Sequence, residues 1–308
     1  MAADPPAGPR RAGDGLTATL RTMPIERVFV AGAGLMGHGI GQVHAAIGKH
    51  VVLYEPDLAR AQAGRERISG NLERAIAKGK IDSNERDAIV GRIVASDDLE
   101  LVRSADLVIE AVFEDAEVKR ELWRDLDERA PAGTIFASNT SSISIDSLAE
   151  ALSAGRRQRF VGMHFFSPVP VMPLVELIRG SATSDATEQA IREVTDELGK
   201  KLIVSADRPG FIVNRLLMPM LAEAMRILEE GSATAEDIDT GAKVGLNHPM
   251  GPLELADFIG LDVCLNVMQV LHDGIGEEHY PPPKVLVDLV NAGHLGQKTG
   301  RGFHTYPR

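Results

Sequence analysis

Residues 28–40, VFVAGAGLMGHGI, decide the fold of this chain. An apolar run typical of a buried strand leads directly into a turn with the spacing G-x-G-x-x-G, and then into residues with helical periodicity. Gly32 permits the tight turn, Gly34 lets the backbone approach a pyrophosphate, and Gly37 lets the helix pack on the strand. The free N–H groups at the start of the helix attract phosphate. The stretch therefore predicts a strand, a turn and a helix that bind a dinucleotide.

A second strand, HVVLYE at residues 50–55, ends in Glu55, 18 residues after Gly37. Dinucleotide-binding units carry an acid about 20 residues beyond the glycine turn, where its carboxylate accepts hydrogen bonds from the ribose hydroxyls. A carboxylate there would repel the 2′-phosphate of NADP, so the sequence predicts NAD as the cofactor. The alternative is that Glu55 is only the solvated end of a strand.

The rest of the first domain alternates helical and strand-like segments. Residues 58–81 are typical of a basic amphipathic helix, whose charges would ordinarily form a solvated face. Short apolar runs at 93–96, 105–112 and 134–139 are separated by helical segments, as in a doubly wound parallel sheet. We therefore expect an α/β fold built on a Rossmann-type sheet.

Two further strands, at 160–166 and 174–178, flank a proline-rich turn. His164 and Glu176 are each six residues from Pro170 at the middle of that connection, so antiparallel pairing would bring them side by side. A carboxylate that orients an imidazole makes it able to exchange a proton with a substrate hydroxyl. The alternative is a hydrogen-bonded histidine of the core.

The strand pattern ceases after Asp207, and the segments that follow all carry helical periodicity. We therefore predict three parts: a disordered leader at 1–23, an NAD-binding Rossmann-type domain at 24–208, and a smaller all-helical domain at 209–308. Apolar residues on several faces of the first long helix, among them Met218, favour a homodimer through the helical domain. Burial within that domain explains them nearly as well.

Length and composition bound the kind of protein. The chain has 308 residues, a formal charge of −11 and no run of about 18 apolar residues, so we expect neither a nucleic-acid nor a membrane partner. One cysteine and nine histidines without a metal-ligand spacing predict no metal site and fit a reducing, cytoplasmic location. The leader lacks the apolar segment of a secretory signal; a targeting segment and a translation start at Met23 are alternatives.

Seven segments, in order, resemble the 3-hydroxyacyl-CoA dehydrogenase family in its free-standing, L-3-hydroxybutyryl-CoA type. They are VFVAGAGLMGHGI, SADLVIEAVFED, FASNTSSISI, GMHFFSPVPVMPLVELI, DRPGFIVNRLL, NHPMGPLELADFIGLD and QKTGRGFHTY. The resemblance implies an NAD-dependent oxidoreductase that interconverts L-3-hydroxyacyl-CoA, of short chain length, and 3-oxoacyl-CoA by hydride transfer. It also implies an acyl-CoA substrate as partner and a place in fatty acid and butanoate metabolism, such as beta-oxidation.

The resemblance further implies roles for four polar residues. His164 would act as the acid-base residue, and Glu176 would orient it and stabilise its charged form. Ser141 would hydrogen-bond the reacting 3-oxygen, and Asn214 would complete the polar site from the helical domain. The catalytic site would then lie between the two domains.

Cofactor and substrate contacts are implied in the same way. The residues implied to contact NAD are Gly32, Gly34, Leu35, Met36, Gly37, Glu55, Glu114, Lys119, Ser141, Ser167 and Lys298. Besides Ser141 and Asn214, Asn71 and Lys78 of the basic helix would contact CoA, the lysine through its phosphates. Ser167 departs from the asparagine often present in the family, and its hydroxyl has a shorter reach.

Three other functions stay open at this point. A dehydrogenase of a carrier-protein-bound hydroxyacyl unit in a biosynthetic pathway would share the fold and the catalytic residues, and activity on free CoA substrates would discriminate it. A sugar-acid dehydrogenase of the crystallin-like branch would carry a different segment around His164. A non-catalytic NAD-binding protein would have no need of Ser141, His164, Glu176 and Asn214 together.

Overall fold

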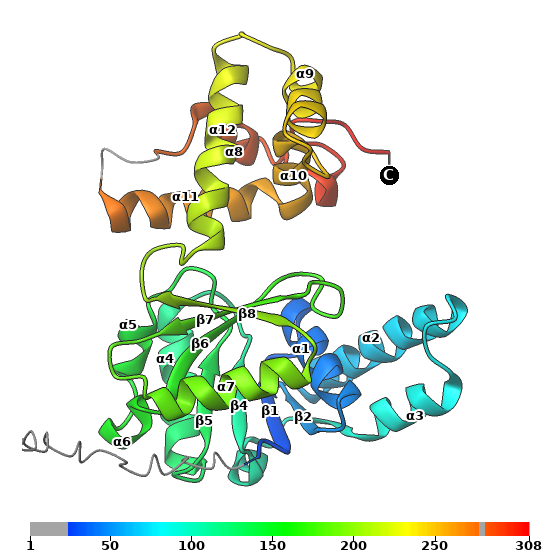
Figure 1. Ribbon diagram of the computed structural model, residues 1–308, viewed down its shortest axis with the longest axis vertical. Coiled ribbons are helices and arrows are strands. Elements are labelled where there is room, and N and C mark those ends of the chain that lie inside the picture. Colours follow the sequence, from blue (N-terminus) through cyan, green and yellow to red (C-terminus); the bar gives the residue numbers. More distant parts are fainter. Residues whose placement is uncertain (1–23, 277–280, 308) are drawn as a thin grey trace, which may run out of the picture.

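The structure, a computed structural model, describes residues 24–276 and 281–307. The leader predicted at 1–23 lies outside the described residues. The described chain forms an eight-stranded sheet with helices on its faces and, over the edge where the parallel strands end, a lobe made of helices (Figure 1). The predicted Rossmann-type α/β sheet followed by an all-helical part is therefore confirmed.

The sheet lobe alternates strands and helices along the chain. Its strands are β1 (Arg27–Ala31), β2 (His50–Tyr54), β3 (Ile93–Ser96), β4 (Leu107–Glu110), β5 (Ile135–Ser138), β6 (Phe160–Phe165), β7 (Leu174–Arg179) and β8 (Lys201–Ala206). Its helices are α1 (Leu35–Ala46), α2 (Leu58–Ala77), α3 (Ser83–Gly91), the short 3₁₀ helix η1 (Leu99–Ser104), α4 (Ala116–Arg129), α5 (Ile145–Ala149), α6 (Ala154–Arg157) and α7 (Asp185–Glu197).

Strand order explains where a ligand can bind. The order is β3-β2-β1-β4-β5-β6-β7-β8, and every neighbouring pair is parallel except β6 and β7. The direction of winding reverses between β1 and β4, and doubly wound sheets bind ligands outside the carboxyl ends of the strands at such a point. The antiparallel turn from β6 to β7 brings that connection to the same edge of the sheet.

The apolar runs recognised in the sequence form the two layers of core on either face of the sheet. Val28, Val30 and Leu53 lie in one layer, and Phe29 and Trp123 lie in the other. The indole of Trp123 stacks on Phe136 at a ring distance of 5.0 Å. Burial of a large apolar side chain stabilises the fold by about 1.5–3 kcal/mol relative to exposure. Successive residues of β1 point to opposite faces of the sheet, so this burial energy fixes which residue of the strand faces which layer.

Aspartates start three helices on the faces of the sheet. The side chain of Asp57 accepts a hydrogen bond from Ala59 N at the start of α2, and that of Asp115 accepts from Val118 N at the start of α4. Asp82 does the same for α3. Such caps satisfy amides that have no helical partner and contribute roughly 1 kcal/mol each.

The helical lobe packs around its own apolar core. It consists of α8 (Val213–Glu229), α9 (Ala235–Thr240), the π-helical turn η2 (Gly241–Gly245), α10 (Pro252–Ile259), α11 (Leu261–Ile275), α12 (Lys284–Asn291) and the 3₁₀ turn η3 (Gln297–Thr299). Met218, Met225 and Cys264 are buried in that core, so the methionines of α8 pack inside the lobe in part. No single helix of the described chain is long and apolar enough to cross a membrane; α10 and α11 reach that length only as a pair bent by 99°.

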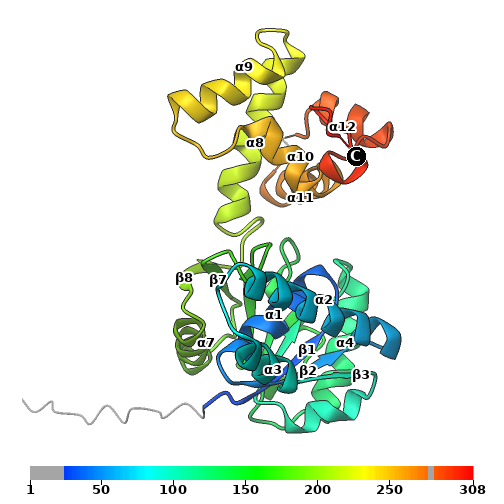
Figure 2. The same ribbon diagram turned by 90° about the vertical axis from the view of Figure 1, so that its right-hand side faces the viewer.

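A single segment joins the two lobes (Figure 2). It leads from β8 through Asp207 and Gly210 to α8. Phe211 in this segment has φ +50°, a backbone conformation that non-glycine residues rarely adopt, and its ring is buried in the core of the sheet lobe. The start of α8 is thus fixed against the sheet although the remainder of the helix belongs to the other lobe.

Candidate active site

The glycine turn after β1 has the geometry that the sequence predicts. Gly32 has φ +103°, and a Cβ on Gly37 would lie 1.7 Å from the carbonyl oxygen of Gly32. Around Gly34, by contrast, no atom of the described chain other than those of Gly34 and its chain neighbours lies within 4 Å of the place a Cβ would take. The outer glycines are therefore required by the turn itself, while the middle one leaves room for a phosphate beside the first turn of α1, formed by Leu35 and Met36.

Glu55 follows β2 and contacts the same turn. Its Oε1 accepts a hydrogen bond from Ala33 N at 2.7 Å. From the other side, Arg67 of α2 donates to Ala33 O at 3.3 Å. The acid, the turn and the switch point between β1 and β4 thus lie together, and the open space at Gly34 means that these residues fit a dinucleotide.

Glu114, after β4, organises the loop that follows β5. Its Oε1 accepts hydrogen bonds from Thr140 Oγ1 at 2.6 Å, Ser141 N at 2.8 Å and Ser142 N at 3.1 Å. Burial opposes ionisation of this carboxyl, but Lys119 Nζ at 3.2 Å and the donors of the loop hold its pKa below the usual value. Glu114 is therefore a charged acceptor that fixes the backbone of Ser141.

Lys119 is buried beneath this loop. Its ammonium, on α4, forms an ion pair with Glu110 at the end of β4, and both side chains are almost fully excluded from solvent. Glu110 Oε2 in turn accepts from Ser138 Oγ at 2.6 Å. The network joins the ends of β4 and β5 to α4, so Lys119 supports the shape of the cofactor edge from below.

His164 and Glu176 face each other on β6 and β7. They are Cα partners in the antiparallel register, as their equal distance from Pro170 predicts. His164 Nδ1 donates to Glu176 Oε2 at 2.9 Å. The pair is buried, and the imidazole packs against the ring of Phe166. Because Nδ1 is held by the carboxylate, Nε2 is the ring nitrogen left for proton exchange.

The second oxygen of Glu176 contacts the segment that joins the lobes. Glu176 Oε1 accepts hydrogen bonds from Ile212 N at 2.8 Å and from Val213 N at 3.0 Å. The next residue, Asn214, donates from its Nδ2 to Ser141 O at 3.3 Å. The structure thus brings four of the predicted site residues, Ser141, His164, Glu176 and Asn214, to one place where β5, the β6–β7 pair and α8 meet.

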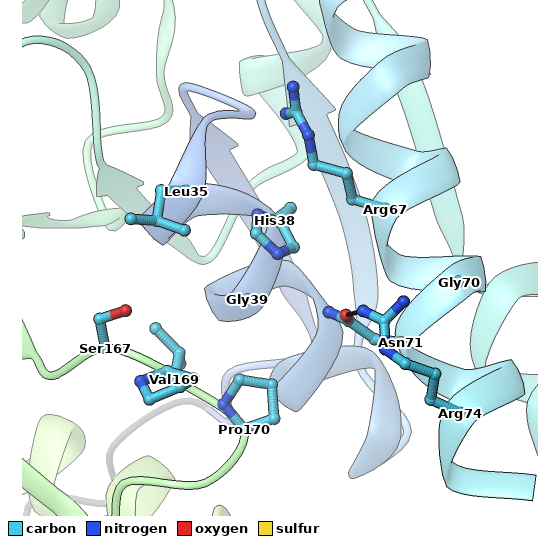
Figure 3. A pocket seen from close by; sticks show the side chains of 11 residues that line it. Leu35, His38, Gly39, Arg67, Gly70, Asn71, Arg74, Ser167, Val169 and Pro170 are labelled. Atoms are coloured by element: carbon cyan, nitrogen blue, oxygen red, sulfur yellow. Dashed lines mark hydrogen bonds between the residues drawn. The ribbon is translucent and has the colours of Figure 1, made fainter. Parts of the chain in front are cut away.

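A cavity of about 390 Å³ extends from the glycine turn along α2 (Figure 3). It is lined by Leu35, His38, Gly39, Arg67, Gly70, Asn71, Arg74, Ser167, Pro168, Val169 and Pro170. Asn71 donates to Gln42 Oε1 at 3.0 Å and accepts from Arg74. The cavity is therefore bounded by the cofactor turn, by polar and cationic side chains of α2, and by the β6–β7 loop that carries Ser167.

Two predicted site residues lie outside this assembly. Lys78 is exposed at the C-terminal end of α2, beyond the lining of the cavity. Lys298 lies in η3 and pairs with Asp262 at 2.5 Å, within the helical lobe. The structure therefore does not bring either lysine to the cofactor edge of the sheet.

No role was predicted from the sequence for three polar residues that line the cavity. Arg67 and Arg74 line it together with Asn71, and His38 borders it from α1. A signal was present, because positions 67, 71 and 74 have the i, i+4, i+7 spacing that places side chains on one face of a helix. His38 had no comparable signal, since its place depends on how α1 and α2 pack.

Both lobes match models of one family. Residues 27–208 match the family model described as 3-hydroxyacyl-CoA dehydrogenase, NAD binding domain. Residues 210–306 match the model described as 3-hydroxyacyl-CoA dehydrogenase, C-terminal domain. Together the two matches span nearly all of the described chain.

Two sequence relatives and a solved structure are similar to this chain over nearly all of its length and of theirs. A 3-hydroxybutyryl-CoA dehydrogenase of Bradyrhizobium diazoefficiens is 49% identical over 282 residues, which cover 92% of this chain and 96% of that protein. The mitochondrial hydroxyacyl-coenzyme A dehydrogenase of Homo sapiens is 44% identical over 302 residues, with 94% of each chain covered. Among solved structures, (S)-3-hydroxybutyryl-CoA dehydrogenase from Ralstonia eutropha has a TM-score of 0.89 and 44% identity, and covers 92% of this chain and 100% of its own.

Proposed function

The chain belongs to the 3-hydroxyacyl-CoA dehydrogenase family, an NAD-dependent family of oxidoreductases, and on that premise we propose that its substrates are short-chain L-3-hydroxyacyl-CoA thioesters such as 3-hydroxybutyryl-CoA. The products of oxidation are the corresponding 3-oxoacyl-CoAs. The observation that carries the proposal is the contact of His164 Nδ1 with Glu176 Oε2 at 2.9 Å, beside Ser141 and Asn214 and at the same sheet edge as the glycine turn.

The residues of the chain divide the chemistry between them. When bound, NAD supplies the acceptor of the hydride that leaves C3 of the hydroxyacyl group. His164 takes the proton of the 3-hydroxyl at Nε2 during oxidation and returns it during reduction. Glu176 keeps the imidazole in the required tautomer and stabilises its protonated form. Ser141 and Asn214 hydrogen-bond the 3-oxygen, where negative charge develops.

The cofactor contacts follow from the same edge of the sheet. We assign the pyrophosphate to Gly32, Gly34, Leu35, Met36 and Gly37, the ribose to Glu55, and further contacts to Glu114, Lys119, Ser141, Ser167 and Lys298. A carboxylate that already accepts from Ala33 N supports the preference for NAD, because it would repel a 2′-phosphate. A contact of Lys298 with the cofactor requires that the helical lobe move toward the sheet.

The nucleotide part of the acyl-CoA substrate would lie along α2. Asn71 lines the cavity beside Arg67 and Arg74, and Lys78 follows one turn further on. These donors would attract the phosphates of CoA locally, although the chain as a whole carries a formal charge of −11.

The assembly and location of the protein belong to the same proposal. We propose a cytoplasmic homodimer that forms through the helical domain at 209–308 and has neither nucleic-acid nor membrane partners. The exposed side chains of Val244 and Leu246 in that lobe support a second copy as the cover of this surface.

A steady-state assay of acetoacetyl-CoA with NADH and with NADPH tests the proposal. We expect turnover with both nucleotides to be measurable and the kcat/KM value with NADH to be much the larger. Longer 3-oxoacyl-CoAs should then be poorer substrates. Binding of NADH without turnover would favour a non-catalytic protein, and turnover confined to an acyl-carrier-protein thioester would favour the biosynthetic alternative.

A further inference from the structure

The loop between β6 and β7, residues 167–173, lies at the surface and forms one wall of the cavity in Figure 3. Its tip is solvated, since Val171 is 72% exposed. Within the loop, Val171 N and Met172 N both donate to Pro168 O at 2.9 Å, which shapes a turn but does not attach it to the rest of the protein. The loop is attached at its end by Lys201 N, which donates to Pro173 O at 2.6 Å, and in its middle by the side chain of Val169, which is buried in the core of the sheet lobe. Two further residues outside the loop, Lys200 and Gly39, contact that middle part.

Lys200, the residue before β8, reaches the loop with its side chain. Its Nζ donates to Val169 O and to Met172 O, both at 2.7 Å. The residue is only 8% exposed, and burial lowers the pKa of its ammonium. Within the described chain no carboxylate forms an ion pair with Lys200, so the two loop carbonyls are the partners of this charge.

A second buried lysine of the same lobe shows the ordinary arrangement. Lys49 Nζ pairs with Glu197 Oε2 at 2.7 Å and with Glu26 Oε1 at 3.5 Å. A buried ammonium is costly without such partners, and an apolar side chain of similar length would avoid the cost. The ammonium of Lys200 is therefore explained by the loop that it holds and not by the packing around it.

Gly39 of α1 also contacts the loop. A Cβ on Gly39 would lie 2.9 Å from the Cβ of Val169, closer than real Cβ atoms approach. The residue next along the cavity wall, Pro170, faces α1 as well (Figure 3). The loop is thus held by the backbone of α1 at Val169 and by the ammonium of Lys200 at Val169 O and Met172 O.

We propose that Lys200 is a positioning residue, which fixes the loop at 167–173 so that Ser167 and the cavity wall stay in place for the cofactor and the acyl-CoA. The proposal rests on the proposed function for its turnover assay. His164 and Glu176 are held by strand pairing and do not depend on the lysine. Loss of Lys200 should therefore weaken binding while the proton-transfer chemistry continues.

Lys200→Met tests this, since it keeps the length of the side chain and removes the donors. We expect KM for acetoacetyl-CoA and for NADH to rise roughly tenfold, the effect of losing a charge-assisted hydrogen bond, with kcat within about twofold of the unaltered chain. The pH profile of kcat should not move. Lys200→Arg retains charge and donors and should recover most of the lost affinity.

Lys49→Met is the matched control. It removes a buried ammonium of the same lobe that does not contact the loop, so it should lower Tm and leave both KM values unchanged. A Lys200→Met chain with lowered Tm and unaltered KM values would reduce Lys200 to a structural residue and overturn the proposal. A loss confined to kcat would overturn it too.

Gly39→Ala keeps the proposal testable if the variants at Lys200 do not fold. The added methyl displaces Val169 from α1, so both KM values should again rise while kcat persists. Unchanged KM values in this variant would show that the position of the loop does not matter. If the unaltered chain fails to turn over acetoacetyl-CoA, the proposed function fails, and titration of NADH fluorescence still reads the effect of Lys200→Met on binding.

Discussion

The two lobes of this protein each contain a histidine bound to a carboxylate. In the sheet lobe, His164 and Glu176 are joined at 2.9 Å; in the helical lobe, His304 Nε2 donates to Asp239 Oδ2 at 2.7 Å. All four side chains are buried or largely buried. The distances and the chemistry of the pairs therefore do not distinguish a catalytic site from a structural one.

The surroundings of the two histidine–carboxylate pairs are different. Asp239 also accepts hydrogen bonds from Leu253 N at 2.8 Å and Glu254 N at 3.1 Å, so both of its oxygens cap the start of α10. His304 then fastens the C-terminal tail to that cap. The pair of the sheet lobe instead lies near Ser141 and Asn214, at the edge of the sheet that also carries the glycine turn. The polar groups near the pair and the glycine turn at the same edge of the sheet are the reason why we propose a chemical role for His164 and Glu176 and not for His304 and Asp239.

The largest effect should separate the two pairs by turnover. His164→Gln and Glu176→Gln should each lower kcat about 10³-fold, because general acid–base catalysis is lost, and leave the Kd of NADH nearly intact. His304→Gln, the matched change in the other pair, should leave kcat within about twofold. Steady-state kinetics and NADH titration measure both. A loss confined to KM in the variants at His164 and Glu176 would contradict the acid–base role.

The second effect should separate the pairs by stability. Asp239→Ala leaves two amides of α10 and the imidazole of His304 without their acceptor, so the free energy of unfolding should fall by roughly 4 kcal/mol. Urea denaturation measures the loss, and kcat at a temperature where the variant stays folded is the control. A variant of unaltered stability would show that solvent replaces Asp239 at no cost.

A third histidine sharpens the comparison because it lacks a carboxylate. His44 is fully buried, and its Nδ1 donates to Ile40 O at 2.8 Å. Burial, together with the charges of Lys49 and Lys200, lowers its pKa to about 4. Since the unfolded chain binds the proton near pH 6.5, the stabilising effect of the neutral form is present above that pH. It is lost as the pH falls toward 4, by on the order of 3 kcal/mol.

Denaturation of the unaltered chain and of His44→Leu between pH 7 and pH 4 measures this contribution. As the pH falls from 7 to 4, the free energy of unfolding should decrease more in the unaltered chain than in the variant. Above pH 7 the two curves should have the same slope. Parallel curves over the whole range would mean that His44 takes up its proton equally in the folded and the unfolded chain, and would contradict the lowered pKa.

The smallest effect is expected for two exposed cationic side chains of α2, Arg74 and Lys78. Arg74→Ala should raise KM for acetoacetyl-CoA about fivefold, because Arg74 lines the cavity, whereas Lys78→Ala should raise it about twofold. Neither change should affect a truncated thioester that lacks the nucleotide part of CoA, and added salt should diminish both effects. Equal losses with the truncated substrate would place the CoA phosphates elsewhere.

The sequence predicts those features that depend on neighbours along the chain. The strand, turn and helix at 28–40 have the expected glycine geometry, and the register of His164 with Glu176 follows from their equal distance from Pro170. Periodicity and turn residues determine such features locally, because one face of each strand must be buried. The apolar runs at 93–96 and 134–139 contain strands β3 and β5, as predicted.

Contacts between distant segments could not be predicted in this way. That one oxygen of Glu114 binds the whole Ser141 loop, or that Lys200 holds the β6–β7 loop, depends on the path of each loop. The pairing of Lys298 with Asp262 depends on how the helical lobe folds on itself. Residue type and spacing indicate that such groups are polar and near the site, but not which atom each of them binds.

The register of β6 and β7 restricts which changes in chain length this protein can tolerate. His164 and Glu176 are Cα partners, and an insertion or deletion that shifted β7 by one residue would turn Glu176 to the opposite face of the sheet. A shift by two would keep the face but move the carboxylate about 7 Å along the strand. The connection at 167–173 can therefore exchange its residues one for one, whereas gaining or losing a residue preserves the pair only if the loop absorbs the change without passing it to the strands.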